Sequence, residues 1–118
     1  MQYMLLIYGD EREWTTMSEA DAKMMYAAYG TFTQELIASG AMRGGSELAP
    51  VSSATTVRLR GGKAQTTDGP FAETKEQLGG YYIIEVPTLD DAVQWAAKIP
   101  SAAWGSVEVR PMVENPAD

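Results

Sequence analysis

Apolar and polar residues alternate along the chain with two different periods, and each period predicts a different element. Residues 2–8 are apolar at both alternating sets of positions and rich in β-prone side chains, which predicts a strand with two apolar faces. Residues 11–17 are polar and predict a loop. From Ser18, a capping residue, to Gly40, apolar side chains recur at steps of four, three and four, which predicts a helix. The stripe consists of Met25, Tyr29, Phe32 and Leu36.

The middle of the chain predicts strands joined by tight turns. Residues 41–48 contain two adjacent glycines and predict a bent strand. Residues 55–60 and 63–67 flank Gly61-Gly62, a pair that is typical of a two-residue hairpin turn. Residues 80–86, rich in tyrosine and isoleucine, predict a further strand.

The last third of the chain predicts a second helix and a final strand. Thr88 suits the N-terminal cap of this helix, and Pro100 ends it. The residues expected to face inward are Leu89, Ala92, Trp95, Ala96 and Ile99. Val107, Val109 and Val113 alternate with polar residues, which predicts the final strand.

Without the inserted hairpin, the predicted order is strand, helix, strand, strand, helix, strand. This order is typical of the ferredoxin-like α+β fold, in which both helices cover one face of an antiparallel sheet. Since the strand at residues 2–8 is apolar on both faces, we expect the second face to be an interface. We therefore expect a single domain at residues 1–114, a tail at residues 115–118, and a symmetric homodimer that packs sheet against sheet.

The composition narrows the possible chemistry. The chain has 118 residues, a formal net charge of −7, and neither cysteine nor histidine. Disulfides, thiol nucleophiles and sites built on histidine are therefore excluded, and no spaced acidic cluster predicts a metal site or a cofactor. The negative charge opposes binding to nucleic acid or to anionic lipid. Because no basic leader and no apolar stretch of about 20 residues is present, we expect a cytoplasmic protein without a membrane span.

Residues 67–80, TDGPFAETKEQLGG, resemble the signature of the DGPF, or YCII-related, proteins. Further similar segments are MQYMLLIYGDE, AAYGTFTQEL, ATTVRLRGGK and GSVEVRP. The resemblance implies a dimeric α–β barrel in which two ferredoxin-like sheets close together, with a cleft in each subunit. It implies no common activity: barrel relatives include enzymes, and DGPF members are often encoded beside extracytoplasmic-function sigma factors. The histidine–aspartate pair suspected to be catalytic in some YCII relatives has no counterpart in a chain without histidine.

Asp68 is the candidate catalytic residue, because a carboxylate between a strand and a Gly-Pro turn can project into a cleft as a general base. It also suits a turn, in which aspartate accepts backbone hydrogen bonds, and both interpretations stay open. The candidates for substrate binding are Tyr8, Arg43, Arg58, Glu73, Lys75, Tyr81 and Arg110. Among these, basic side chains would hold a negative charge and tyrosines would line a pocket. The same charges also suit solvated loops or ion pairs between subunits.

Two functions are compatible with these residues. The first is a small enzyme that uses a carboxylate for acid–base chemistry on a small organic acid or an aromatic-type metabolite. The alternative is a non-catalytic ligand-binding protein or a regulatory partner of an extracytoplasmic-function sigma factor. The surroundings of Asp68 discriminate between a ligand site and a turn, since a buried carboxylate facing a cavity favours the former.

Overall fold

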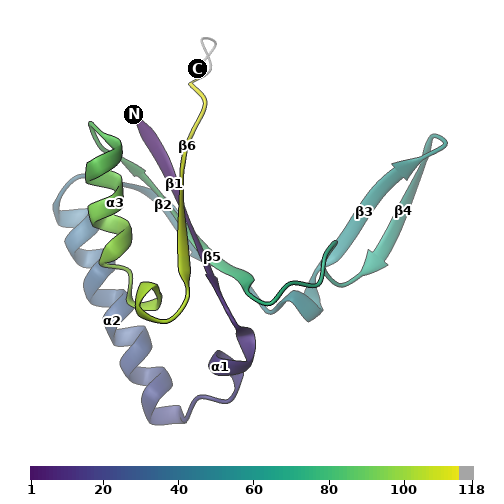
Figure 1. Ribbon diagram of the computed structural model, residues 1–118, viewed down its shortest axis with the longest axis horizontal. Helices are drawn as coiled ribbons and strands as arrows, with labels where there is room; N and C mark the ends of the chain where they lie inside the picture. The colour runs from purple at the N-terminus through teal and green to yellow at the C-terminus, as the bar shows by residue number, and fades with distance from the viewer. Residues whose placement is uncertain (115–118) are drawn as a thin grey trace.

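The computed structural model describes residues 1–114, which form an α+β structure with a four-stranded antiparallel sheet and a separate two-stranded hairpin (Figure 1). The strands are β1 (Gln2–Gly9), β2 (Met42–Glu47), β3 (Thr55–Arg60), β4 (Lys63–Asp68), β5 (Gln77–Glu85) and β6 (Ser106–Pro111). The helices are α1 (Glu11–Thr15), α2 (Glu19–Ala38) and α3 (Leu89–Ala97), with two short 3-10 helices, η1 (Val51–Ser53) and η2 (Pro100–Ala103). The tail predicted at 115–118 lies outside the described residues.

The short helix α1 replaces the loop that was expected at residues 11–17, so this prediction was wrong. The side chain of Asp10 caps α1 by accepting a hydrogen bond from the backbone N–H of Arg12 at 2.9 Å. Glu11 and Glu13 occupy the first turn, where negative charge stabilises a helix. Five residues are too few to show a helical period, which explains why the pattern of apolar positions did not reveal this helix.

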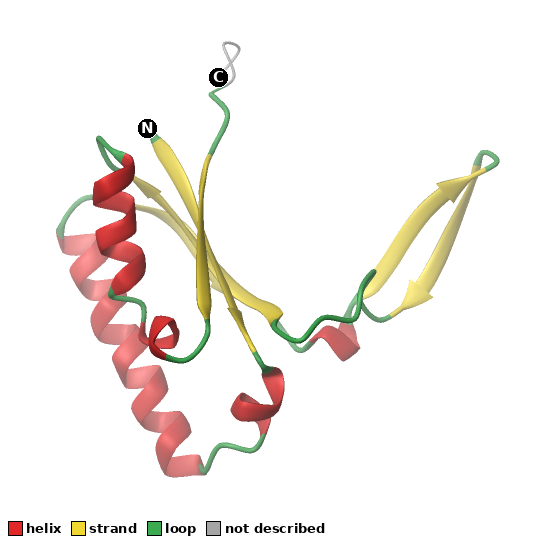
Figure 2. Cartoon of the chain, viewed as in Figure 1, coloured by secondary structure: helices red, strands yellow, loops and turns green. Residues whose placement is uncertain are grey.

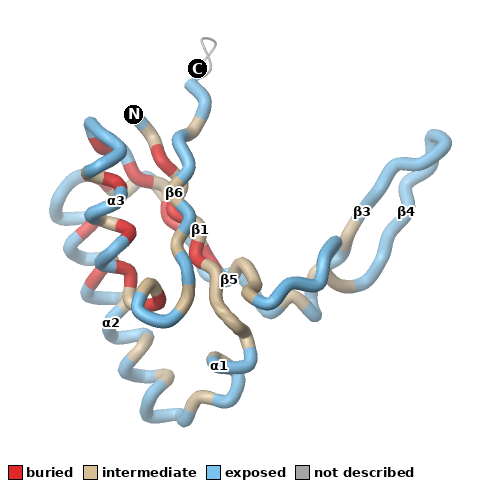
Figure 3. The backbone as a smooth tube through the Cα atoms, in the orientation of Figure 1, coloured by how far each residue is buried: buried red, intermediate tan, exposed pale blue. Residues whose placement is uncertain are grey.

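The main sheet has the strand order β2-β5-β1-β6, with every neighbouring pair antiparallel. Its inner face packs against α2 and α3, and Figure 3 shows the buried residues gathered between these layers. Leu5 lies opposite Tyr82 on β5 and Val109 on β6, so the core runs across the centre of the sheet. The core residues of the sheet are Tyr3, Leu5, Ile7, Tyr82 and Ile84.

Both long helices contribute the stripes that their periods predicted, with one exception. Phe32 of α2 makes edge-to-face contacts with Tyr82, at 5.1 Å between ring centroids, and with Trp95 of α3, at 6.0 Å. The buried helix-side residues are Phe32, Leu36, Ala92, Ala96 and Ile99. Leu89 was expected to face inward but is 50 % exposed, because it occupies the first position of α3 at the margin of the core.

The final strand is shorter than predicted. β6 ends at Pro111, and Val113 is 95 % exposed rather than part of the sheet. The backbone N–H of Met112 still bonds to the carbonyl of Gln2, which is the first residue of β1. Beyond this point β1 offers no further partner, so the ladder stops.

Among residues 1–114, the helices leave the second face of the sheet uncovered. Figure 2 shows α2 and α3 on one side of the strands, with the hairpin on the other. We call this second face the outer face and define it by Met4, Leu6, Tyr8, Tyr81 and Ile83, all partly exposed. Register places Met4 opposite Ile83 and Leu6 opposite Tyr81, so an apolar strip runs along β1 and β5. On β6 it is bordered by Arg110 and Glu108, which lie opposite the same two residues of β1.

The hairpin of β3 and β4, residues 55–68, is called the arm. Gly61 and Gly62 make its turn with φ of +57° and +77°, the left-handed conformation that a two-residue hairpin of this twist requires. Figure 1 shows the arm standing out from the rest of the chain. The radius of gyration is 16.4 Å, whereas a compact domain of this length has one of about 13.5 Å. None of the helices in residues 1–114 is long and apolar enough to cross a membrane.

Candidate functional site

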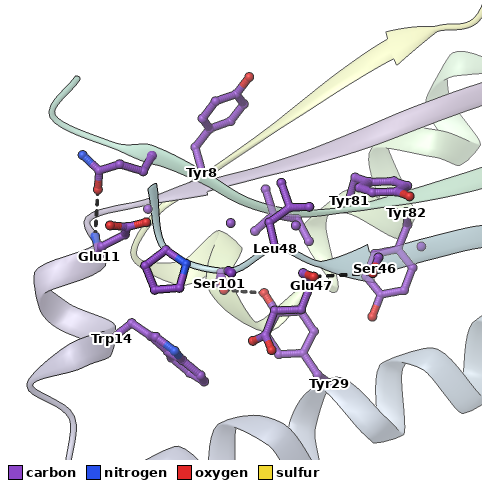
Figure 4. Close-up of a pocket in the computed structure, with 18 of the residues that line it drawn as sticks. Tyr8, Glu11, Trp14, Tyr29, Ser46, Glu47, Leu48, Tyr81, Tyr82 and Ser101 are labelled. Atoms are coloured by element: carbon purple, nitrogen blue, oxygen red, sulfur yellow. Dashed lines mark hydrogen bonds between the residues drawn. The ribbon is translucent and has the colours of Figure 1, made fainter. Parts of the chain in front are cut away.

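A cleft of about 670 Å³ opens between one end of the inner sheet face and helices α1 and α2. This volume falls within the range of about 300–1,000 Å³ that is usual for small-molecule sites. The aromatic residues that line the cleft on its helix side are Trp14, Tyr26, Tyr29, Tyr82 and Trp104. Figure 4 shows Trp14, Glu47 and Tyr29 around the same opening, although they come from α1, β2 and α2.

Two hydroxyl groups form one wall of the cleft. Tyr29 on α2 and Ser101 on η2 are hydrogen-bonded to each other, as the dashed line in Figure 4 marks. Ser101 is buried, with 7 % of its surface exposed. Burial raises the pKa of the Tyr29 hydroxyl above its usual value, and the bond with Ser101 opposes part of this shift. Tyr29 therefore remains a neutral donor and acceptor at physiological pH.

A second hydroxyl pair continues the same wall. The hydroxyl groups of Thr33 and Tyr82 lie 2.8 Å apart, which joins α2 to β5. Both residues line the cleft, and the ring of Tyr82 is itself buried at 8 % exposure. The wall is therefore held rigidly by bonds between the helix and the elements that face it.

Glu47 is a carboxylate of the cleft that forms no ion pair and accepts no backbone hydrogen bond within residues 1–114. Both of its carboxylate oxygens accept a hydrogen bond from the Tyr26 hydroxyl at 3.2 Å. Loss of solvent and the negative charge of Glu47 both raise the pKa of Tyr26. Ion pairs within residues 1–114 join Arg12 to Asp10, Arg43 to Glu85 and Lys98 to Glu35, and none involves Glu47.

The other two carboxylates that line the cleft are occupied by structural bonds. Glu11 accepts a hydrogen bond from the backbone N–H of Val51, and its own N–H donates to the Gln77 side chain, both at 2.9 Å. Asp10 forms an ion pair with Arg12 at 2.7 Å, and the hydrogen bonds from Arg12 lower the pKa of Asp10 to about 2. These contacts fasten α1 to the start of β5 and to η1.

The charge of the lining limits which molecules it suits. Asp10, Glu11 and Glu47 are acidic, and the lining contains no lysine or arginine in the part of the chain that the structure describes. An anionic ligand would lose its hydration without gaining a counter-charge, whereas a neutral or cationic ligand would not. Aromatic faces beside a carboxylate also attract cations.

Only two of the residues singled out from the sequence line the cleft, namely Tyr8 and Tyr81. The ring of Tyr8 points away from Tyr29 and Ser101 in Figure 4, toward the other side of the sheet. The six that do not line the cleft, all exposed, are Arg43, Arg58, Asp68, Glu73, Lys75 and Arg110.

The structure places Asp68 at the base of the arm, directly before Gly69, whose φ is +97°. It ends β4 on the arm, where it pairs with Thr55, and its side chain is exposed to solvent. Within residues 1–114 its carboxylate neither faces the cleft nor accepts a hydrogen bond from a backbone amide. Its part in a site is thus untested by this single chain.

Reasoning from the sequence missed Glu47, Ser101 and Trp14. Tyr29 was recognised only as part of an apolar stripe, although a hydroxyl in such a stripe indicates a polar partner. Ser101 supplies that partner from 72 residues away, a distance over which no local pattern acts. No group of three or more carboxylates suited to a metal ion occurs among residues 1–114.

Comparisons with known proteins show which family the sequence resembles. The family of the YCII-related domain matches residues 1–115. A protein of Rhizobium meliloti (strain 1021), described as uncharacterised, is 34 % identical over 114 residues, which are 95 % of this chain and 92 % of that protein. The resemblance to the YCII-related proteins is thereby confirmed over nearly the whole chain.

Proposed function

This chain belongs to the YCII-related domain family, and we propose that it binds a small aromatic molecule with a cationic group in the cleft beside α1 and α2. The observation that carries the proposal is the Glu47 carboxylate, which lines an aromatic cleft and has no cationic partner among residues 1–114. A bound ammonium group would supply a cationic partner for Glu47. In an enzyme built on this cleft, Glu47 would be the acid–base carboxylate, since Asp68 lies on the arm.

The surrounding residues support recognition of the rest of the ligand. Trp14 and Tyr26 make an edge-to-face contact at 5.2 Å, which holds two aromatic rings at the opening. Such rings attract a cation with about 0.5–2 kcal/mol. The buried pair of Tyr29 and Ser101 offers a fixed hydroxyl to a polar substituent. The organic acid considered from the sequence is less suited, because the arginines and lysines expected to hold it lie outside the cleft.

Isothermal titration calorimetry with two matched probes tests this proposal. We expect 2-phenylethylammonium to bind at least tenfold more tightly than 3-phenylpropionate, which has a similar size and the opposite charge. Glu47→Gln should weaken binding of the ammonium probe by about tenfold, equivalent to about 1.4 kcal/mol for a lost charge-assisted bond. Glu13→Gln, an exposed change on α1 outside the lining, serves as the matched control and should leave affinity unaltered. Equal or tighter binding of the carboxylate probe would overturn the proposal.

We further propose that the main sheet is ferredoxin-like and that two copies form a dimeric α–β barrel through the outer face. The partial exposure of Met4, Leu6 and Ile83 supports this, because an uncovered apolar strip of this kind usually marks an interface. Light scattering during size-exclusion chromatography should give about twice the 12.8 kDa mass of one chain. Leu6→Lys should halve that mass, whereas Thr16→Lys, on an exposed residue after α1, should not. A wild-type mass of one chain would refute the dimer.

A further inference from the structure

The two faces of the arm differ in character. Register places Val57 opposite Thr66 and Leu59 opposite Ala64, so these side chains share one face. Arg58 and Arg60 alternate with them and therefore lie on the other face, together with Lys63 and Gln65. Val57 is 62 % exposed and Leu59 is 67 % exposed. The arm thus has an apolar face and a cationic face, and both are open to solvent in the single chain.

Within residues 1–114, no other strand pairs with the arm. β3 and β4 form a two-stranded ladder with each other, and neither joins the main sheet. Isolated two-stranded hairpins are marginally stable in water at best, because they bury little apolar surface. Phe71 lies three residues after the end of the arm and adds a further apolar side chain that is 78 % exposed. An ordered arm of this kind needs another surface against which to pack.

The position of the arm indicates which surface this is. Figure 1 shows α2 and α3 on one side of the main sheet and the arm on the opposite side. The uncovered outer face belongs to that same side of the sheet. A second copy docked on the outer face would therefore occupy the region beside the arm, where it would meet the arm's apolar residues.

Charge favours the same partner. The arm holds three basic residues and one acidic residue, a net charge of +2; since the whole chain carries −7, the remaining residues carry −9. The arm is therefore attracted to the acidic remainder of another copy, which we call the body. This attraction acts over a range of about 8–10 Å at ordinary ionic strength. The positive charge of the arm would also attract nucleic acid, but the strongly acidic body would repel the phosphates of the nucleic acid.

We infer that the arm is a clasp whose apolar face, formed by Val57, Leu59 and Ala64, packs against a second copy of this chain. The cationic residues of the opposite face then lie at the rim, near the acidic surface of that copy. This inference rests on the dimer proposed above, and it assigns to the arm a role that the cleft does not require. The stretch that leads into the DGPF signature is then an assembly element.

Sedimentation velocity over a dilution series measures the dimer dissociation constant of the full chain. The double variant Val57→Thr with Leu59→Thr replaces two apolar side chains of the arm with threonine, which is β-branched and favours strands. Because the apolar face is lost, the dimer dissociation constant should rise by at least tenfold. Gln65→Thr, on the cationic face, is the matched control and should change it by less than twofold. Raising the salt from 50 to 500 mM should also weaken the wild-type dimer, because the arm and the body carry opposite charges.

Hydrogen exchange provides a readout that does not depend on affinity. Amides of residues 55–68 should exchange quickly in the monomeric Leu6→Lys variant and slowly in the wild-type dimer. If the wild type is a monomer, both the dimer and the clasp fail. A different result would refute only the clasp. In that result Leu6→Lys disrupts the dimer, whereas Val57→Thr with Leu59→Thr dimerises normally and the amides of residues 55–68 exchange quickly. Micromolar binding of a mixed-sequence RNA at 150 mM salt, lost in Arg58→Ala with Arg60→Ala while the dimer constant is unchanged, would also overturn the clasp.

Discussion

The hydroxyl groups of Tyr29 and Ser101 are hydrogen-bonded to each other, although 72 residues separate them in the sequence. The bond joins the middle of α2 to the 3-10 helix η2 beyond the second long helix. Ser101 has only 7 % of its surface exposed, so its hydroxyl would be poorly solvated without Tyr29. The pair therefore both closes the core at this end of the sheet and shapes the wall of the cleft.

Removing either hydroxyl should destabilise the fold. We expect Tyr29→Phe and Ser101→Ala each to lower the free energy of unfolding by about 1–2 kcal/mol, because each leaves a buried polar group without a partner. The double variant should cost about 1 kcal/mol less than the sum of the two single changes, since the second removal loses no bond. Urea unfolding monitored by circular dichroism measures all three values. Strictly additive losses would show that the bond contributes nothing.

The ion pair between Asp10 and Arg12 predicts a pH dependence with a definite sign. The pKa of Asp10 falls from 3.8 to about 2, chiefly through hydrogen bonds from the Arg12 side chain and backbone. Because the unfolded state then binds the proton more readily, this stabilisation is complete above about pH 4 and is lost as the pH falls toward 2. The effect is small, since the pair lies at the surface.

Asp10→Asn keeps a helix cap but removes the titrating group, so its Tm should fall less steeply between pH 4 and pH 2 than that of the wild type. Arg12→Met should partly flatten the same interval, because it removes the side-chain hydrogen bonds, the largest cause of the shift, and keeps the backbone N–H bond. Thermal unfolding by circular dichroism at half-unit pH steps provides the comparison. Parallel curves for all three proteins would contradict the assigned role of Arg12.

Two glycines should respond oppositely to the same substitution. A Cβ on Gly105 would collide with the backbone carbonyl oxygen of Tyr8, which cannot move without disturbing β1. We expect Gly105→Ala to cost more than about 2 kcal/mol. A Cβ on Gly30 meets nothing within 4 Å in the exposed part of α2, so Gly30→Ala should stabilise the protein by about 0.5–1 kcal/mol. Denaturant midpoints that moved in the same direction would argue against this packing.

The core of α2 offers a matched pair of neighbours. Leu36 is fully buried at 0 % exposure, whereas Ile37 is 51 % exposed on the solvent side. Leu36→Ala should reduce the free energy of unfolding by about 2–5 kcal/mol through loss of burial and the cavity left behind. Ile37→Ala should cost well under half as much, because little contact is removed. Equal losses in urea titrations would mean that the helix faces the sheet in another rotation.

Local chemistry along the chain was enough to predict most of the fold. Ser18 accepts a hydrogen bond from the Asp21 N–H at 3.1 Å, and Thr88 accepts one from the Asp91 N–H at 3.2 Å, so both predicted helix starts are confirmed. The turn at Gly61-Gly62 is also confirmed. These signals are readable because a cap or a tight turn depends on residues only two or three places apart. Helix α1 escaped because it is a single turn.

The candidate site could be predicted only in part. Asp68 and Lys75 were predicted as site residues because they lie in the signature at residues 67–80. Such a motif does not determine which cavity its side chains face. Glu47 belongs to no recognisable motif. Only the fold shows its importance, because β2 places its carboxylate within hydrogen-bond distance of the Tyr26 hydroxyl on α2. The sigma-factor partner implied by the family resemblance stays a prediction.

The sequence by itself determined the alternation of strands and helices, the excluded chemistry and the family. These follow from periodicity, composition and short motifs, which act over a few residues. The tertiary structure alone decided where the cleft opens, that Tyr29 meets Ser101, and that the arm stands apart from the body. Such features depend on contacts between segments far apart in the chain. They are stabilised by the packing of the whole chain, so no single segment determines them.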